Sequence, residues 1–263
     1  MISYVLEIFG EHTLSSPEVF GLLGISILLL AAYGVHGRSI PFPLLRLALF
    51  RIRSFRIAVT GSFVTRIGIG GVPFLLPPLY QVGLGYTPIQ SGLLIMPQAL
   101  GALSVKAVMR PLLRRFGYRL VLFCNTTIIG ALLAGFSGIG AKTPVLLILA
   151  MAYCYGWFTS LQYTSMNTLV YADTHEDEAS SASSIASTMQ QLSISFGVAV
   201  AGLTSALFIP RNTVTNGPAV IRGIHDAFLL LGVLTVVSGL VFAGLRAGDG
   251  SDVSQQNPAH HGG

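Results

Sequence analysis

The sequence contains seven apolar runs, each long enough to cross a lipid bilayer as a helix. An α-helix rises 1.5 Å per residue, so roughly 20 apolar residues cover the ~30 Å of hydrocarbon in a membrane. Backbone groups in lipid must be satisfied within their own segment, which favours helices. The sequence therefore predicts an all-α membrane protein with spans near residues 18–36, 57–80, 90–109, 119–138, 144–170, 183–208 and 226–245.

Charge and cysteine content agree with this class and exclude others. Only 10% of the residues are charged, whereas an ordinary soluble domain has about 25%. The net charge of +5 could indicate nucleic acid, but the basic residues lie between the apolar runs, so we predict a lipid partner and no nucleic-acid partner. Cys124 and Cys154 lie inside apolar runs and are interpreted as small buried hydrophobic residues. No metal site or cofactor is predicted.

The distribution of lysine and arginine predicts the orientation, because cytoplasmic connections retain an excess of both. One side has eleven, at Arg38, Arg46, Arg51, Arg53, Arg56, Lys106, Arg110, Arg114, Arg115, Arg119 and Arg246, and the other has three, at Lys142, Arg211 and Arg222. We therefore predict a cytoplasmic C-terminus. The expected organisation is an external segment and first span at 1–37, a basic connection at 38–56, a six-helix bundle at 57–246 and a disordered tail at 247–263.

Arg66 is the residue that a simple membrane span does not explain. It lies nine residues into the second span, about 13 Å from the inner face, so its side chain cannot easily reach water. The sequence has no Asp or Glu from Val19 to Ala172. We expect Arg66 to meet backbone carbonyls, cavity water, an anionic substrate group or a carboxylate from outside this chain. An interior arginine with no role in transport is the alternative.

Polar residues and helix breakers accompany this arginine. Polar side chains within or beside spans are predicted to line a substrate cavity with Arg66: Gln98, Gln162, Asn167 and Gln190. Interhelical hydrogen bonds are the alternative for each. The breakers that follow Arg66 suit a bendable, gating span or close helix packing: Gly68, Gly70, Gly71, Pro73, Pro77 and Pro78. Aromatic residues that crowd the 144–170 run are assigned to packing and interface belts: Tyr153, Tyr155, Trp157, Phe158 and Tyr163.

Enzymatic alternatives depend on weak motifs, and no catalytic residue is predicted. Residues 135–138 read GFSG, which resembles the GxSG of rhomboid intramembrane proteases, but Ser137 ends a span instead of beginning one. The later histidines, His175 and His225, lie in an acidic loop and at an outer helix start. The last span has no lysine that could form a Schiff base with retinal.

Several motifs together resemble the fourteen-helix drug/proton antiporter branch of the major facilitator superfamily. FLLPPLYQVGLGYTPIQSGLLIMPQALGAL is similar to that branch's P-x-Y-x-Q and G-x-(S/T)-x-x-x-(A/S)-G-L-x-x-x-P sequences. RRFGYR, with Arg115, Gly117 and Arg119, resembles the D-R-x-G-R cytoplasmic loop, although Arg114 occupies the acidic position. SMNTLVYAD and ASSIASTMQQLSISFGVAVAG look like the twelfth helix end and the thirteenth helix. Jointly these motifs cover roughly residues 40–208.

The resemblance implies the C-terminal portion only: one linker helix plus the six-helix C-terminal bundle. It implies proton-coupled efflux of small amphiphilic drugs or metabolites across the bacterial inner membrane, with a midplane site between two bundles. Proton antiport needs a titratable group within the membrane, and none lies deep in the seven spans, so coupling is expected to involve the N-terminal half. A truncated fragment without transport activity is the alternative, and an intramembrane serine hydrolase is a remote one.

Overall fold

The computed structural model describes residues 47–172, 174, 178–208, 217–246 and 249. The predicted first span and most of the predicted tail lie outside these residues. The described part begins with η1 (Leu47–Arg51), a short 3-10 turn. The helices that follow are α3 (Arg53–Gly70), α4 (Val72–Pro78), the π-helical η2 (Leu79–Gly83), α5 (Pro88–Ile95), α6 (Pro97–Phe136), α7 (Val145–Val170), α8 (Ala179–Phe208) and α9 (Gly217–Ala243). The prediction of an all-α membrane protein is confirmed.

Four helical segments of the described part are long and apolar enough to cross a membrane, at 53–83, 88–136, 145–170 and 221–243. Six spans were predicted for this part of the chain, so the structure does not reproduce the predicted number. One reason is that the segment 88–136 contains two of the predicted spans. At 1.5 Å per residue its 49 residues would extend about 73 Å, more than twice the hydrocarbon thickness. A second reason is α8, which covers the predicted span 183–208 but is not among the four.

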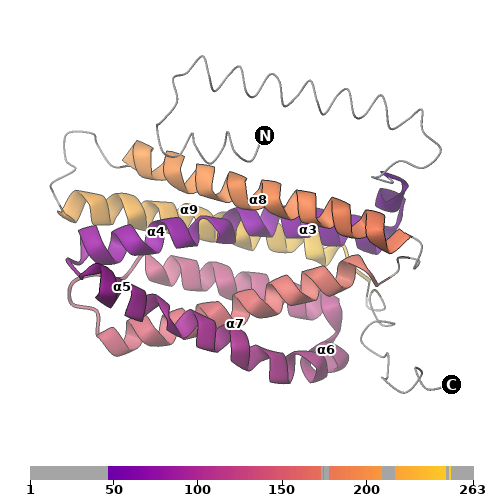
Figure 1. Cartoon of the computed structure of the whole chain (residues 1–263), viewed down its shortest axis with the longest axis horizontal. Coiled ribbons are helices and arrows are strands. Elements are labelled where there is room, and N and C mark those ends of the chain that lie inside the picture. The colour runs from indigo at the N-terminus through magenta and orange to yellow at the C-terminus, as the bar shows by residue number, and fades with distance from the viewer. Residues whose placement is uncertain (1–46, 173, 175–177, 209–216, 247–248, 250–263) are drawn as a thin grey trace, which may run out of the picture.

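Gly117 divides α6 into the two predicted spans. Its backbone has φ 72° and ψ 162°, which lies outside the helical region and within a region that is accessible essentially to glycine alone. The chain reverses there, and the second half of α6 runs back beside the first (Figure 1). The RRFGYR motif therefore forms the turn between two membrane-crossing halves, as its resemblance to a cytoplasmic loop implied.

We expect Gly117→Ala to destabilise this turn, because a Cβ atom is unfavourable at that φ and ψ. The cost should be about 1–3 kcal/mol, the range for strained backbone conformations. Thermal unfolding of the purified protein in detergent measures it. Gly92→Ala is the matched control, because Gly92 lies in α5 with no atom within 4 Å of an added Cβ atom. Equal melting temperatures for the two variants would contradict the assigned turn.

The helices pack as two connected groups. α6 packs on α7 and α9, while α3 packs on α8 and α9 and also meets α7 (Figure 1). Two buried apolar clusters fill the bundle, one around Tyr80, Phe136 and Phe228 and the other around Phe55 and Phe242. Because α3 contacts α7, residues of α3 lie beside residues of α7 that follow about a hundred positions later in the sequence.

Basic residues of different helices meet at one end of the bundle. The Arg53 guanidinium, at the start of α3, donates to the Gly244 carbonyl just after α9. Ala243, the last residue of α9, lies beside Gly117 and Arg119. The start of α3, the end of α9 and the turn of α6 therefore share one end, and all three carry residues that were assigned to the cytoplasmic side.

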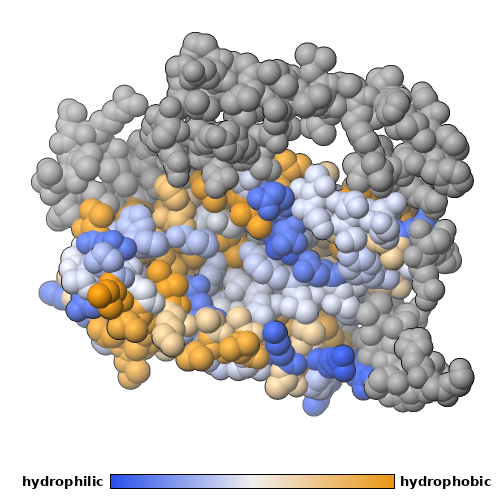
Figure 2. Space-filling model, in the orientation of Figure 1, coloured by the Kyte–Doolittle hydropathy of each residue, from blue (hydrophilic) through white to orange (hydrophobic). Residues whose placement is uncertain are grey.

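The visible face of the bundle has both polar and hydrophobic regions (Figure 2). In the view of Figure 2, pale and blue residues occupy the middle of the visible face, between α8 and the α6–α7 pair. Hydrophobic orange residues occupy the end near α5 and the lower edge. Several polar residues on α7 and α8 are exposed, among them Asn167, Ser184, Thr188 and Gln191. A face of this composition suits contact with water or protein better than contact with lipid tails.

Candidate functional site: a buried arginine beside a polar depression

Arg66 lies in the interior of the bundle, near the middle of the first membrane-crossing segment. It is only 2% exposed. Its Nε donates to Ser62 Oγ at 2.9 Å, one turn earlier on α3, and its Nη2 donates to Asn167 Oδ1 on α7 at 3.0 Å. The guanidinium also lies over the Tyr163 ring, 4.1 Å from the ring centroid. Three side chains from two helices therefore hold this arginine.

These partners differ from those we expected. A hydroxyl, an amide oxygen and an aromatic ring take the places of the carbonyls, water or anion that were considered. All three groups are uncharged, so they satisfy hydrogen bonds and solvate the cation without neutralising it. The helix period explains the arrangement, because Tyr163 and Asn167 are four residues apart and present one face of α7 to α3. The packing of α3 against α7 brings the face with Arg66 and the face with Tyr163 and Asn167 together.

A polar depression of about 390 Å³ adjoins the arginine through Tyr163. Its walls come from the first half of α6 and from α7, and the lining residues are Gln98, Ala99, Ala102, Gly156, Thr159, Ser160, Tyr163 and Thr164. The Gln98 side-chain nitrogen is buried here and has no hydrogen-bond partner within the described residues. The Thr159 and Ser160 hydroxyls donate to backbone carbonyls, so the depression has a mixed polar and apolar lining, which suits an amphiphilic ligand.

The predicted cavity residues divide into two groups. Arg66 and Asn167 are bonded to each other, and Gln98 lines the depression beside Tyr163. Gln162 lies elsewhere: it is fully buried, accepts from Asn125 Nδ2 at 2.7 Å and donates to Thr126 Oγ1 at 3.1 Å. This placement corrects the cavity assignment of Gln162 in favour of an interhelical hydrogen bond between α6 and α7. Gln190 is half-buried on α8.

The glycines after Arg66 lie at close helix contacts. A Cβ atom at Gly68 would meet the Thr235 side chain of α9, and one at Gly71 would meet Ala201 at 2.8 Å and the Gly197 carbonyl at 2.9 Å on α8. A Cβ atom at Gly70 would be 3.4 Å from Ile194, which is ordinary contact. Packing therefore accounts for Gly68 and Gly71.

The prolines follow a break in the helix. α3 ends at Gly70, Pro73 lies in the first turn of α4, and Pro77 and Pro78 precede the π-helical η2. Proline lacks the backbone donor that a regular helix needs, so this part of the span is segmented. The gating interpretation requires a segmented helix of this kind.

Ser137 and His225, the described residues that were considered for hydrolysis, each contact a backbone carbonyl. Ser137 Oγ donates to the Ala134 carbonyl at 2.6 Å, as a serine at a helix end commonly does. The His225 ring nitrogen Nε2 lies 2.8 Å from the Ile139 carbonyl oxygen. His175 lies outside the described residues. No group of three or more potential metal ligands occurs among the residues that the structure describes.

Sequence reasoning missed two of the partners of Arg66. Ser62 was not considered, and Tyr163 was assigned to packing and interface belts. Both could have been found from spacing: Ser62 precedes Arg66 by four residues, and Tyr163 precedes Asn167 by four, so each pair shares a helix face. The decisive fact, that the two faces meet each other, is visible only in the structure.

Comparison with known proteins gives one family. The family model for the Major Facilitator Superfamily matches residues 19–198 and, in a second alignment, 58–262. Similar proteins carry the name "Putative multidrug resistance protein MdtD". The one from Yersinia enterocolitica is 31% identical over 254 residues, which cover 96% of this chain and 54% of the relative. The one from Klebsiella pneumoniae is 33% identical over 250 residues, which cover 92% and 52%.

A further relative of that name, from Serratia proteamaculans, is 31% identical over 234 residues, which cover 89% of this chain and 49% of the relative. The chain thus spans about half the length of the curated relatives that it matches. The matched residues include the helices that hold Arg66, its partners and the depression. On these matches, the chain belongs to the major facilitator superfamily.

Proposed function

We propose that this chain is the C-terminal half of a secondary active transporter that exports small amphiphilic compounds across the bacterial inner membrane. The observation that carries the proposal is the buried Arg66, whose partners among the described residues are uncharged side chains and which Tyr163 joins to a polar depression. The name of the relatives, a multidrug resistance protein, supports the substrate class. A transporter of this kind is not an enzyme, and no cofactor is proposed.

The charge of Arg66 explains why a second group is needed. An arginine at the centre of a membrane span costs about 2.5–3.5 kcal/mol on insertion scales, and neutral neighbours only reduce that cost. Asn167, which accepts a hydrogen bond from Arg66, is itself exposed. An anionic substrate group, or a carboxylate from the remaining half of the longer protein, would complete the site.

Proton coupling is proposed to involve the N-terminal half of the longer protein. Antiport requires a group that titrates within the membrane, which is usually Asp, Glu or His. The helices that hold the site, from α3 to α7, contain no Asp or Glu. Among the described residues, Asp226 lies within the first turns of α9 and is exposed, away from the Arg66 site. Arg66 would then bind the substrate or a carboxylate of the N-terminal half, while a titratable group of that half carries the proton.

Orientation and movement complete the proposal. The end that collects Arg53, Arg119 and Arg246 is assigned to the cytoplasm, so the C-terminus is cytoplasmic. The segmented stretch from Gly68 to Pro78 is proposed as the gate of the first bundle helix, with Gly68 and Gly71 as its packing contacts. The domain bounds 1–37, 38–56, 57–246 and 247–263 are retained, except that α3 begins at Arg53, within the basic connection.

The decisive experiment measures drug accumulation in cells that express the complete reading frame. We expect lower accumulation of an amphiphilic dye than in empty-vector cells, and we expect a proton uncoupler to abolish the difference. Export that persists after the proton gradient collapses would overturn proton coupling. The 263-residue chain expressed alone is expected to give no export, and export by it alone would contradict the need for a second half.

A further inference from the structure

Two adjoining depressions lie on the outside of the α6 turn, at the basic end of the bundle. The first, of about 420 Å³, is lined by Phe116, Gly117, Arg119, Leu120, Phe123 and Ala243. The second, of about 340 Å³, is almost wholly apolar and runs between α6 and α7. Phe116 and Leu120 line both, so the two depressions adjoin each other at these side chains. Neither belongs to the Arg66 site.

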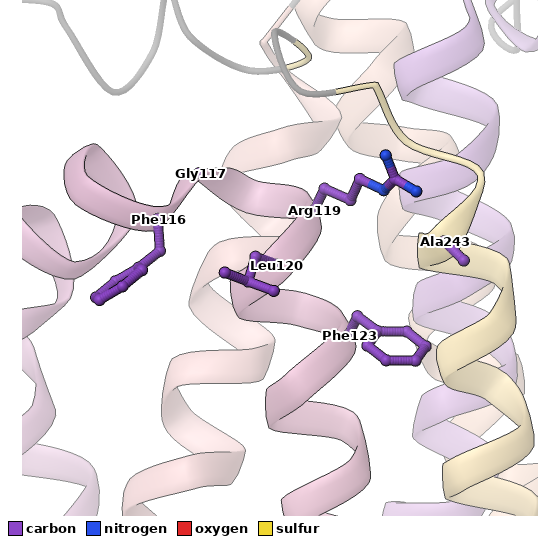
Figure 3. Close-up of a pocket in the computed structure, with 6 residues that line it drawn as sticks. All are labelled: Phe116, Gly117, Arg119, Leu120, Phe123 and Ala243. Carbon is purple, nitrogen blue, oxygen red and sulfur yellow. The ribbon is translucent and has the colours of Figure 1, made fainter.

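The first depression presents one cation on an apolar floor. Figure 3 shows the Arg119 side chain extending from the second half of α6 toward Ala243, with Phe123 below it and Leu120 on the other side of the helix. Arg119 is exposed. Arg115 lies close by, with its guanidinium 5.7 Å from the centroid of the Phe116 ring. The wall of this depression comes from α6 and from Ala243 of α9, and none of its lining residues is a carboxylate, so the local field favours an anion.

The second depression has the length and composition of an acyl-chain groove. Its apolar walls include Leu112, Ile128, Trp157, Phe158 and Leu161. From Arg119 to Ile128 the helix rises about 13 Å, close to half of the ~30 Å hydrocarbon thickness. A charged group at the membrane surface therefore leads into an apolar groove that extends toward the bilayer centre.

We propose that these depressions bind one anionic phospholipid, with its phosphate at Arg119 and one acyl chain in the groove beside Trp157. Basic pockets between membrane helices on the cytoplasmic side suit anionic head groups, and the apolar groove requires a ligand with a chain. The break at Gly117 opens the space, because it separates Phe116 from the turn that carries Leu120. The lipid would tie the α6 turn to the end of α9.

Trp157 is the single tryptophan of the chain and lines the groove, so it reports occupancy directly. The full 263-residue chain is reconstituted in phosphatidylcholine bilayers that contain a small fraction of phosphatidylglycerol with brominated acyl chains. We expect stronger quenching of Trp157 fluorescence than with the same fraction of brominated phosphatidylcholine. Arg119→Gln should weaken the apparent preference about fivefold, the effect of removing one basic residue near an anionic surface.

Arg110→Gln is the matched control, because Arg110 is an exposed arginine on the first half of α6 that lines neither depression. It should keep most of the preference. Cys124→Phe tests the groove itself, because Cys124 lines it and a larger side chain there would fill it. This variant should reduce quenching by both lipids.

Four results would overturn the proposal. Equal quenching by the two brominated lipids would show a groove that takes lipid without recognising its head group. Loss of the preference in Arg110→Gln as fully as in Arg119→Gln would show general surface attraction. Competition by inorganic phosphate, or no quenching by either lipid, would mean that the site binds a free anion or is covered by another part of the protein.

Discussion

Replacing Arg66 with alanine in the complete protein is expected to abolish drug export while membrane levels remain near normal. The change removes the only basic residue of the α3 interior, two hydrogen bonds and the contact with Tyr163. Because an interior arginine is costly, its removal should not destabilise insertion of the span. Drug tolerance and dye accumulation measure export, and immunoblotting of membranes measures the level of protein.

Arg66→Lys separates charge from geometry. Lysine keeps the charge but cannot donate to Ser62 and Asn167 from a planar fork while its cation lies over Tyr163. We therefore expect Arg66→Lys to retain little export. Asn167→Ala, which leaves Ser62 and Tyr163 in place, should reduce export less than the loss of Arg66.

Arg56→Gln is the control for this series, since Arg56 is an exposed arginine on the same helix. It should leave export largely intact. Drug tolerance that stays unchanged in Arg66→Ala would show that the arginine only packs, and the proposed site would be wrong.

Replacing Gly156 with alanine is expected to produce the largest loss of stability among single methyl additions to α7. An added Cβ atom would meet backbone atoms of Gln98, including its carbonyl oxygen, and backbone cannot move aside as a flexible side chain can. Overpacking commonly costs about 1–3 kcal/mol, and a clash with backbone should lie at or above the upper end of that range. Detergent-solubilised protein should melt at a lower temperature and aggregate earlier.

The matched control is again Gly92→Ala, where an added Cβ atom meets nothing within 4 Å. Gly101→Ala offers a second test, because its Cβ atom would meet the Tyr153 carbonyl oxygen across the same α6–α7 contact. Both interface variants should also distort the polar depression, which Gly156 lines. A Gly156→Ala protein that melts with the wild type would show that α6 and α7 do not approach as closely as the structure has them.

The sequence was sufficient for the class of protein and for much of its helical organisation. Apolar runs of about 20 residues have one stable form in lipid, so the predicted spans at 144–170, 183–208 and 226–245 each coincide with a helix, although α9 begins nine residues earlier than predicted. The division of α6 at Gly117 was also predictable, because a basic Gly-containing stretch separated two runs. The importance of Arg66 followed from the cost of a charge in lipid.

Only the tertiary structure decided which polar residues meet. Gln162 and Asn167 lie on the same helix five residues apart, yet Gln162 faces Asn125 of α6 and Asn167 faces Arg66 of α3. Five residues turn a helix by about 140° beyond a full turn, so such neighbours point to different partners. The sequence alone determined that the chain crosses a membrane as helices and carries a costly charge. The partners of that charge were decided by helix packing, because side-chain direction has meaning only once the neighbouring helices are in place.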